Sequence, residues 1–202
     1  MFRRITNRNF KPGELDRDGL IQELDNSAAG GVVAVSINAP IPGGLMAITS
    51  VPFNDLDAVE QEEDSFLADA DRITQRRALD SKCLSVRTIV WKTIESFENN
   101  TGITPKYVMR TTIKAKPGKA QEIISSLQEG RNAQVEGGNR FSISTPINGY
   151  PDFVRITGLM ESLSVVGETV DRITANENLY YRSSELIQER FRDVSRIMHR
   201  KV

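Results

Sequence analysis

The sequence predicts an α+β protein built from two tandem units that share one element order, β-α-β-β-α-β. Two observations support this fold class. Short landmarks recur in the same order along the chain, and each recurrence begins with an alternating stretch followed by apolar residues at helical spacing. Alternation predicts a strand, because successive side chains of a strand point to opposite faces of a sheet.

The internal repeat rests on landmarks that recur at a nearly constant offset along the chain. Two copies of Lys-Pro-Gly, at 11–13 and 116–118, give an offset of 105 residues (116 minus 11). The segment "SINAPI" at 36–41 recurs as "SISTPI" at 142–147, and "IT" at 48–49 recurs at 156–157. Landmarks kept in one order with small drifts indicate a duplicated unit.

In the first unit, the periodicity predicts six elements: a strand over 2–10, a helix through Leu20, Ile21 and Leu24, strands over 32–38 and 45–50, a helix from about Asp57, and a strand over 84–92. Asp57 followed by Glu60 fits a capping box at the start of the second helix. The acidic run at 60–64 then predicts a solvated helix face that complements the helix dipole.

The second unit repeats the order: a strand over 106–115, a helix through 120–127, strands over 140–145 and 152–157, a long helix from 164 to about 190, and a strand over 193–201. Pro117-Gly118 ends its first strand, and Asn148-Gly149 predicts a hairpin turn between the two central strands. The helix over 120–127 is predicted because its apolar residues recur at i, i+3, i+4 and i+7.

The element order is that of the ferredoxin-like arrangement, in which two helices cover one face of a four-stranded antiparallel sheet. We therefore expect unit boundaries at 1–95 and 106–202, with a polar, turn-rich linker over 96–105. The face of each sheet that no helix covers must be solvated or pack against another layer, and the equivalent sheet of the same chain is the nearest candidate.

Composition and charge exclude several classes of protein. A net charge of −1 with basic residues spread along the chain argues against a nucleic-acid partner. No apolar run is long enough to cross a bilayer, and no nucleotide, phosphate or zinc motif occurs, so neither a membrane partner, a metal nor a cofactor is expected. With Cys83 as the one cysteine, no disulfide forms within the chain, and we expect a cytoplasmic protein.

The chain resembles the dimeric α/β-barrel superfamily, in its antibiotic-biosynthesis-monooxygenase-like branch. The resemblance lies in a first strand running into "KPGK" and an amphipathic helix, the central hairpin, the long second helix and a last strand "VSRIMHRK", over 2–92 and 106–201. It implies that the two units form a pseudo-dimeric barrel within one chain. Members of this superfamily include cofactor-independent oxygenases, polyketide cyclases, haem-degrading monooxygenases, isomerases and proteins without demonstrated chemistry.

The resemblance disfavours one of these activities. A haem-degrading member would carry an Asn, a Trp and a His within one unit. The first unit has Asn38 and Trp91 but no histidine, and the second has His199 but no tryptophan. Haem degradation is therefore not the expected activity.

His199 is the one histidine of the chain, so an imidazole general base would have to be this residue. By the same offset as the repeated "IT" it corresponds to Trp91, and an aromatic substrate could stack there and lose a proton. Strand alternation places His199 on the face of Ser195 and Ile197, which we expect to point inward. A packed tryptophan and a surface histidine would explain the same residues without chemistry.

Further candidates lie on the polar faces of the central strands. Arg140, Arg155 and Arg110 could hold an anionic or enolate oxygen, with Ser142 and Ser144 on the same face. Tyr107 and Asn38 are further substrate-binding candidates. The arginines could equally be solvated charges or partners of nearby acidic residues.

Two functional hypotheses follow. The first is a cofactor-independent monooxygenase or cyclase acting on a small aromatic or polyketide-like substrate. The second is a small-ligand-binding or assembly protein of the same fold without chemistry, favoured by the low aromatic content of 6%. Both take a small molecule as partner, and exposed sheet edges make a homodimer a further expectation.

Overall fold

The computed structural model describes residues 1–37, 44–97, 104–132, 141–175 and 185–201. These residues form two compact units, the first made of residues 1–92 with 195–202 and the second of residues 93–194. The end of the last strand, which the sequence boundaries place with the second unit, is thus part of the first. Each unit follows the β-α-β-β-α-β order that the sequence predicts, with the second helix of unit 1 divided into two.

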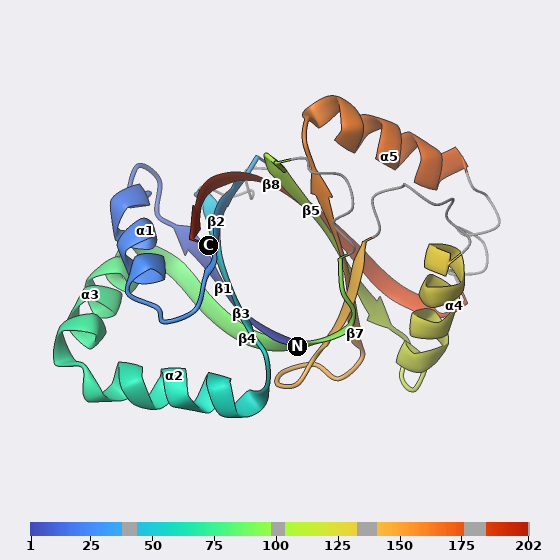
Figure 1. Ribbon diagram of the computed structural model, residues 1–202. Helices are drawn as coiled ribbons and strands as arrows, with labels where there is room; N and C mark the ends of the chain where they lie inside the picture. The colour runs from blue at the N-terminus through green and yellow to red at the C-terminus, as the bar shows by residue number, and fades with distance from the viewer. Residues whose placement is uncertain (38–43, 98–103, 133–140, 176–184, 202) are drawn as a thin grey trace. The chain divides into compact units, whose positions relative to one another are not determined.

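Unit 1 is a five-stranded antiparallel sheet with three helices on one face (Figure 1). The strand order is β4-β1-β3-β2-β8, where β8 contributes residues 195–201. The elements are β1 (Phe2–Phe10), α1 (Arg17–Asp25), β2 (Gly31–Ser36), β3 (Met46–Phe53), α2 (Leu56–Ala68), α3 (Ala70–Ser81) and β4 (Cys83–Glu95). Asn38, a predicted substrate-binding residue, lies outside the described residues.

Unit 2 follows the same plan, with strand order β6-β7-β5-β8 and two helices on one face (Figure 1). Its elements are β5 (Tyr107–Ala115), α4 (Ala120–Asn132), β6 (Ser142–Pro146), β7 (Phe153–Met160), α5 (Leu163–Ala175) and the first part of β8 (Ile187–Lys201). The helix predicted to run to about residue 190 is therefore too long, since β8 already begins at Ile187. Arg140 lies outside the described residues.

The repeated Lys-Pro-Gly turn has a backbone reason. Gly13 and Gly118 have φ angles of 80° and 76°, in the left-handed region that glycine adopts without a steric cost. Each turn leads from the first strand of its unit toward the first helix. The Lys-Pro-Gly sequence thus occurs twice because the chain makes the same change of direction between strand and helix in both units.

The second helix of unit 1 starts and ends differently from the prediction. Its N-cap is Asp55, whose Oδ1 accepts a hydrogen bond from the Ala58 backbone N–H at 2.8 Å, so the predicted capping box at Asp57 is wrong. The helix is also interrupted at Asp69, which accepts from the backbone N–H groups of Asp71 and Arg72 and so caps α3. At the start of α2, Asp55 thus serves as the N-cap in place of Asp57, which lies two residues later.

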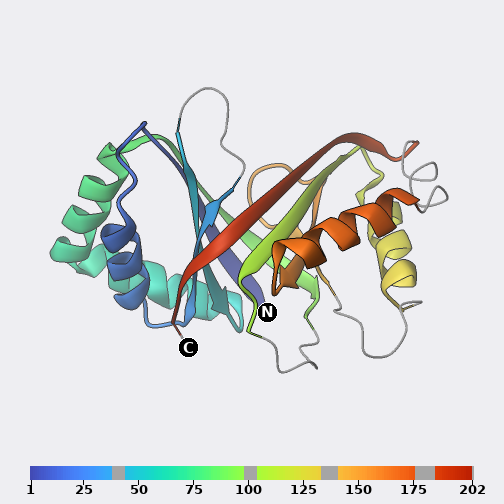
Figure 2. The ribbon, with the colours of Figure 1, turned by 90° about the horizontal axis from the view of Figure 1, so that it is seen from above.

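Helix α1 lies alongside α3 on the sheet of unit 1, as the second view shows (Figure 2). The core between helices and sheet is a cluster of Phe10, Leu20, Leu24, Val33, Ala47, Val51, Phe53 and Leu79. In unit 2 the helix-facing side of the sheet carries a cluster of Ile113, Ala115, Ile123, Ile124, Ile143 and Val154. Within the described residues, no helix is both long and apolar enough to span a membrane.

Candidate functional site

Four of the residues predicted from sequence share one face of the unit 2 sheet. Strand register sets Arg110 opposite Thr157 and Arg155 opposite both Thr112 and Ser144, and residues directly opposite each other share a face. Ser142 stands opposite Thr157 on that face. All four predicted residues, Arg110, Arg155, Ser142 and Ser144, are buried.

The two arginines of this face have partners within unit 2. Arg155 donates from Nε to Thr112 Oγ1 at 3.2 Å, and a terminal nitrogen of Arg110 lies 3.6 Å from Asp193 Oδ2. Tyr107 instead packs beside Met109, Met160 and Val166 on the helix side of the sheet. Tyr107, a predicted substrate-binding residue, is therefore on the opposite face from the arginines.

His199 is not beside Trp91. The β2–β8 register shifts between Val33 and Ala34, so Ile197 pairs with Ala34 while His199 pairs with Val33. The bulge reverses the alternation that placed His199 on the face of Ile197, and its Nε2 lies 3.0 Å from Asp25 Oδ1 at the end of α1. Trp91, 1% exposed, lies on the other face of the sheet, opposite Arg3.

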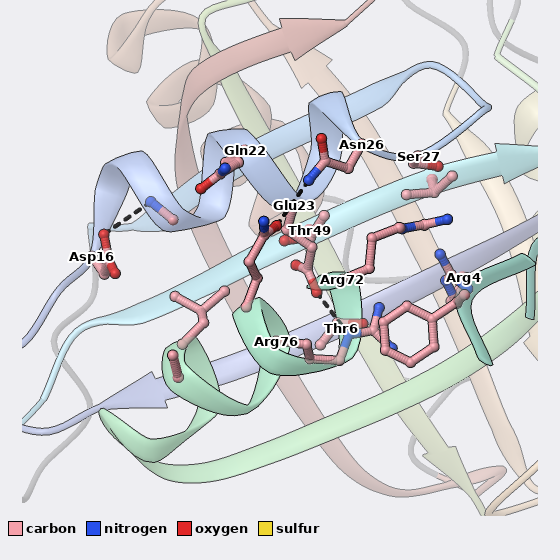
Figure 3. A pocket seen from close by; sticks show the side chains of 16 residues that line it. Arg4, Thr6, Asp16, Gln22, Glu23, Asn26, Ser27, Thr49, Arg72 and Arg76 are labelled. Carbon is pink, nitrogen blue, oxygen red and sulfur yellow. Dashed lines mark hydrogen bonds and ion pairs between the residues drawn. The ribbon is translucent and has the colours of Figure 1, made fainter. Parts of the chain in front are cut away.

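The described residues of unit 1 instead form a cavity of about 170 Å³ between the sheet and its helices (Figure 3). Strand β1 contributes Arg4 and Thr6 to its walls, and β3 contributes Thr49 and Val51. The remaining polar lining comes from α1 with its two caps, from Ser27 just after α1 and from α3, namely Asp16, Gln22, Glu23, Asn26, Ser27, Arg72, Gln75 and Arg76. We call this cavity the unit 1 pocket.

Sequence reasoning missed this pocket, although β1 holds a signal for it. Arg4, Thr6, Arg8 and Phe10 alternate along the strand, and Phe10 belongs to the helix-facing core. Three polar residues therefore point at the helices, where an apolar face is expected. Polar side chains on a helix-covered face need partners there, which is a reason to search that layer for a site.

Arg8, 1% exposed, is held by a group of acidic residues beside the pocket. Its two terminal nitrogens donate to the two carboxylate oxygens of Glu23, each at 2.7 Å, and its Nε donates to Asp80 Oδ1 at 2.7 Å. Burial works to raise the pKa of Glu23, but the attraction and hydrogen bonds of Arg8 and then Arg76 outweigh it and leave the pKa below its ordinary value. Glu23 therefore remains a carboxylate at neutral pH.

A second ion cluster contains Arg4 and Arg72 of the pocket lining and corrects the prediction for the acidic run. Glu62, predicted on a solvated face, is 4% exposed. Its Oε1 accepts from Arg72 at 2.6 Å and lies 3.7 Å from Arg4, while Oε2 accepts from the Ala28 backbone N–H at 3.3 Å. Glu62 is buried because two arginines and a backbone donor compensate its charge.

Arg76 offers the pocket donors that the fold does not use. It contacts Glu23 through Nε at 3.0 Å, and its guanidinium carbon lies 4.0 Å from the centre of the Phe66 ring. Among the described residues its two terminal nitrogens make no hydrogen bond. A guanidinium fixed at one nitrogen and by an aromatic face is a preorganised donor toward an oxyanion.

The pocket contains little that can transfer a proton. Its carboxylates are Glu23 and Asp16; the Lys82 hydrogen bond and the Gly19 backbone N–H hold the pKa of Asp16 below its ordinary value. Neither histidine, cysteine, lysine nor tyrosine belongs to the lining among the described residues. In that same part of the chain, no three His, Cys, Asp or Glu side chains are grouped to hold a metal ion. The site can bind and stabilise negative charge.

Comparison with solved structures identifies the fold class of this chain. Neither a protein-family model nor a curated protein matches the chain. A presumed monooxygenase from Fusobacterium nucleatum subsp. nucleatum is similar over 99% of this chain and 93% of its own, with 10% identity and a TM-score of 0.68. The chain has the dimeric α/β-barrel fold.

Two further solved structures support this fold class. An anthrone oxidase-like protein matches 99% of this chain and 92% of its own, with 12% identity and a TM-score of 0.62. A presumed monooxygenase from Lactobacillus acidophilus NCFM matches 100% of this chain and 97% of its own, with 12% identity and a TM-score of 0.62. Both structures share the fold of this chain over nearly its whole length.

Proposed function

We propose that this chain is a cofactor-independent monooxygenase or cyclase that binds a small aromatic or polyketide-like substrate in the unit 1 pocket. The observation that carries the proposal is Arg76, whose terminal nitrogens are available to a ligand beside the Phe66 ring. The monooxygenase-like fold and the anthrone oxidase-like neighbour support an oxygen-dependent reaction on a phenolic or enolic carbon.

In this proposal the substrate supplies the electrons. An enol or phenol bound in the pocket loses its proton to solvent at the rim, where Gln22, Asn26 and Gln75 are exposed. Arg76 stabilises the resulting oxyanion, and the electron-rich carbon reacts with dioxygen. For a ring methylene the balance is CH2 plus O2 giving C=O plus H2O. For a cyclase, the same enolate attacks a carbonyl of the same molecule and dioxygen is not consumed.

A non-catalytic ligand-binding protein is the second candidate. It is favoured by the position of His199 beside Asp25 and by the lowered pKa values of Asp16 and Glu23, because carboxylates with low pKa values are weak bases. Under this candidate the pocket binds the same ligands and releases them unchanged.

Dioxygen uptake and product analysis with a panel of single-ring phenols, including 1,3,5-trihydroxybenzene, and β-diketones, in the presence of a chelator, test the proposal. We expect turnover, and Arg76→Gln should lower kcat/KM about 100-fold through loss of an oxyanion donor. Arg17→Gln, an exposed arginine on α1, is the matched control and should keep the full rate. Binding without any product would reject catalysis and establish the ligand-binding candidate.

A further inference from the structure

We infer that the ligand of the unit 1 pocket is a single-ring compound with at least two ring oxygens, and that the hydroxyls of Thr49 and Ser27 select it. The inference rests on the proposed function only in placing the ligand in this pocket. It concerns recognition and holds whether or not the bound compound is converted.

The size of the cavity limits the ligand to about one ring. Its volume is about 170 Å³. A cavity of about 150 Å³ in another protein accommodates benzene, so one substituted ring fits here and a fused three-ring compound does not fit within the walls. The apolar wall residues Val51, Phe66 and Leu79 supply contacts for the faces and edge of such a ring.

Thr49 and Ser27 are buried hydroxyl residues of the lining, 5% and 4% exposed. Neither Thr49 Oγ1 nor Ser27 Oγ has a hydrogen-bond partner among the described residues. A hydroxyl donates one hydrogen bond and accepts two, and leaving it unpaired in the interior destabilises the fold. A ligand oxygen would satisfy each of them.

Thr6, a neighbour of Thr49, shows that this part of the sheet can provide a hydroxyl with a hydrogen-bond partner. Thr6 stands directly opposite Thr49 in the β1–β3 register and also lines the pocket. Its Oγ1 is 3.0 Å from Thr88 Oγ1, so Thr6 has a partner within the sheet. Thr49 is therefore distinguished from Thr6 by its unused hydrogen-bonding capacity and not by its position.

Ser27 is held in place through its backbone while its hydroxyl stays unused. The Nζ group of Lys201 donates to the Ser27 carbonyl oxygen, and the next residue, Ala28, donates its backbone N–H to Glu62 at 3.3 Å. These contacts from the end of β8 and from α2 fix the chain on both sides of the Ser27 side chain. A fixed hydroxyl discriminates ligands more sharply than a mobile one.

The donors lie on different walls, which sets the number of ligand oxygens. Thr49 comes from the sheet and Arg76 from α3, as Figure 3 shows. Donors on two different walls favour a ligand that carries oxygens at different ring positions. We therefore assign an anionic ring oxygen to Arg76 and at least one neutral oxygen on another ring position to Thr49 or Ser27.

Titrations of the intact chain with 1,3,5-trihydroxybenzene, phenol and toluene, followed by NMR or calorimetry, test this inference. Trihydroxybenzene should bind about tenfold more tightly than phenol, and toluene should bind most weakly. Thr49→Val should reduce the affinity for trihydroxybenzene about fivefold and leave that for phenol unchanged. Ser27→Ala should act in the same direction, and the matched control Thr74→Val, an exposed threonine of α3 outside the lining, should leave the affinity ratio unchanged.

Thermal unfolding of the unliganded chain gives an independent measurement. Thr49→Val removes an unpaired buried hydroxyl and should raise Tm by about 2 to 4 °C, whereas Thr6→Val breaks the hydrogen bond to Thr88 and should lower Tm. A Thr49→Val variant with a lowered Tm and unaltered ligand ratios would show that the hydroxyl serves the fold or a structural water, and the inference would be wrong.

The test of ligand recognition and the test of catalysis can fail independently of each other. Equal affinities for trihydroxybenzene and phenol, or no binding of any of the three probes, overturn the inference even where another substrate is turned over. The predicted affinity ranking with no dioxygen uptake and no product supports the inference and rejects catalysis.

Discussion

The two units share a topology but differ in what lies between helices and sheet. In unit 2 this layer is apolar, with Ile113, Ile143 and Val154 among its core residues. In unit 1 the corresponding layer contains Arg4 and Arg8, both buried and both ion-paired. By the Lys-Pro-Gly offset of 105 residues, Arg4 corresponds to Met109 and Arg8 to Ile113.

The third strands differ in the same way. Thr49 faces Thr6 in unit 1, and Ile156 faces Thr111 in unit 2, so register makes Thr49 and Ile156 equivalent. Ile156 packs against the apolar core of its unit, whereas Thr49 lines the pocket. The two units thus share their strand pairing but differ in the side chains of one layer, and this difference supports the proposed ligand site in unit 1.

Replacing Arg8 by methionine should have the largest effect on stability. Arg8→Met leaves Glu23 with Arg76 alone and removes the partner of Asp80, and breaking a buried ion pair costs about 3 to 5 kcal/mol. Urea unfolding of the variant measures the loss.

A second variant separates the charge from the packing. Arg8→Met combined with Glu23→Leu and Asp80→Asn makes the layer resemble that of unit 2, and it should recover most of the stability while losing ligand binding. Recovery of both stability and binding would contradict the division of roles between the units.

Cavity formation in unit 2 is the corresponding test of the apolar layer. Ile143 is fully buried, and Ile143→Ala should reduce the free energy of unfolding by about 3 kcal/mol through lost contacts and a residual cavity. Affinity for pocket ligands should not change under conditions where the variant is folded. A large change in affinity would show that unit 2 contributes to the site.

The fold was largely predictable because periodicity and the repeat are local properties of the sequence. Alternation in 2–10 and helical spacing around Leu20 and Leu24 indicated β1 and α1, and both leucines are buried. The prediction was wrong at the start of β8, because the absence of proline near residue 187 does not distinguish a helix from a strand. The capping residue was misplaced because two aspartates, Asp55 and Asp57, can each serve as the N-cap by sequence.

The site was less predictable because it depends on pairs that are distant in sequence. Arg8 meets Glu23 and Asp80 only after β1, α1 and α3 are packed together. The repeated "IT" also equates Thr49 with Thr157, while the strand register equates it with Ile156. A one-residue error moves a side chain to the other face, so the asymmetry of the units was hidden.

Acid pH should reduce the free energy of unfolding moderately through Glu23, in the layer between helices and sheet of unit 1. Because the pKa of Glu23 is lowered in the folded state, its contribution to stability is fully present above about pH 4.5 and is lost as the pH falls toward the folded-state pKa. The slope for one proton is at most about 1.4 kcal/mol per pH unit. Glu23→Gln should flatten the stability profile below pH 4.5, measured by urea unfolding at several pH values. An unchanged slope would show that Glu23 is not linked to folding.

The smallest effect is expected for His199, and it decides between the sequence-based and the structure-based site. The β-bulge beside Val33 directs His199 to Asp25, where both side chains are partly solvated, and such a pair contributes about 0 to 1 kcal/mol. His199→Ala should therefore change the free energy of unfolding by less than about 1 kcal/mol and leave ligand affinity and any turnover unaltered. Thermal unfolding and the dioxygen-uptake assay measure both. Asp25→Ala, which removes the same hydrogen bond from the other side, is the matched control. If His199→Ala lowered turnover more than tenfold while Asp25→Ala did not, the imidazole would have a role in the reaction that its position beside α1 does not explain, and the assignment of the chemistry to Arg76 would have to be abandoned.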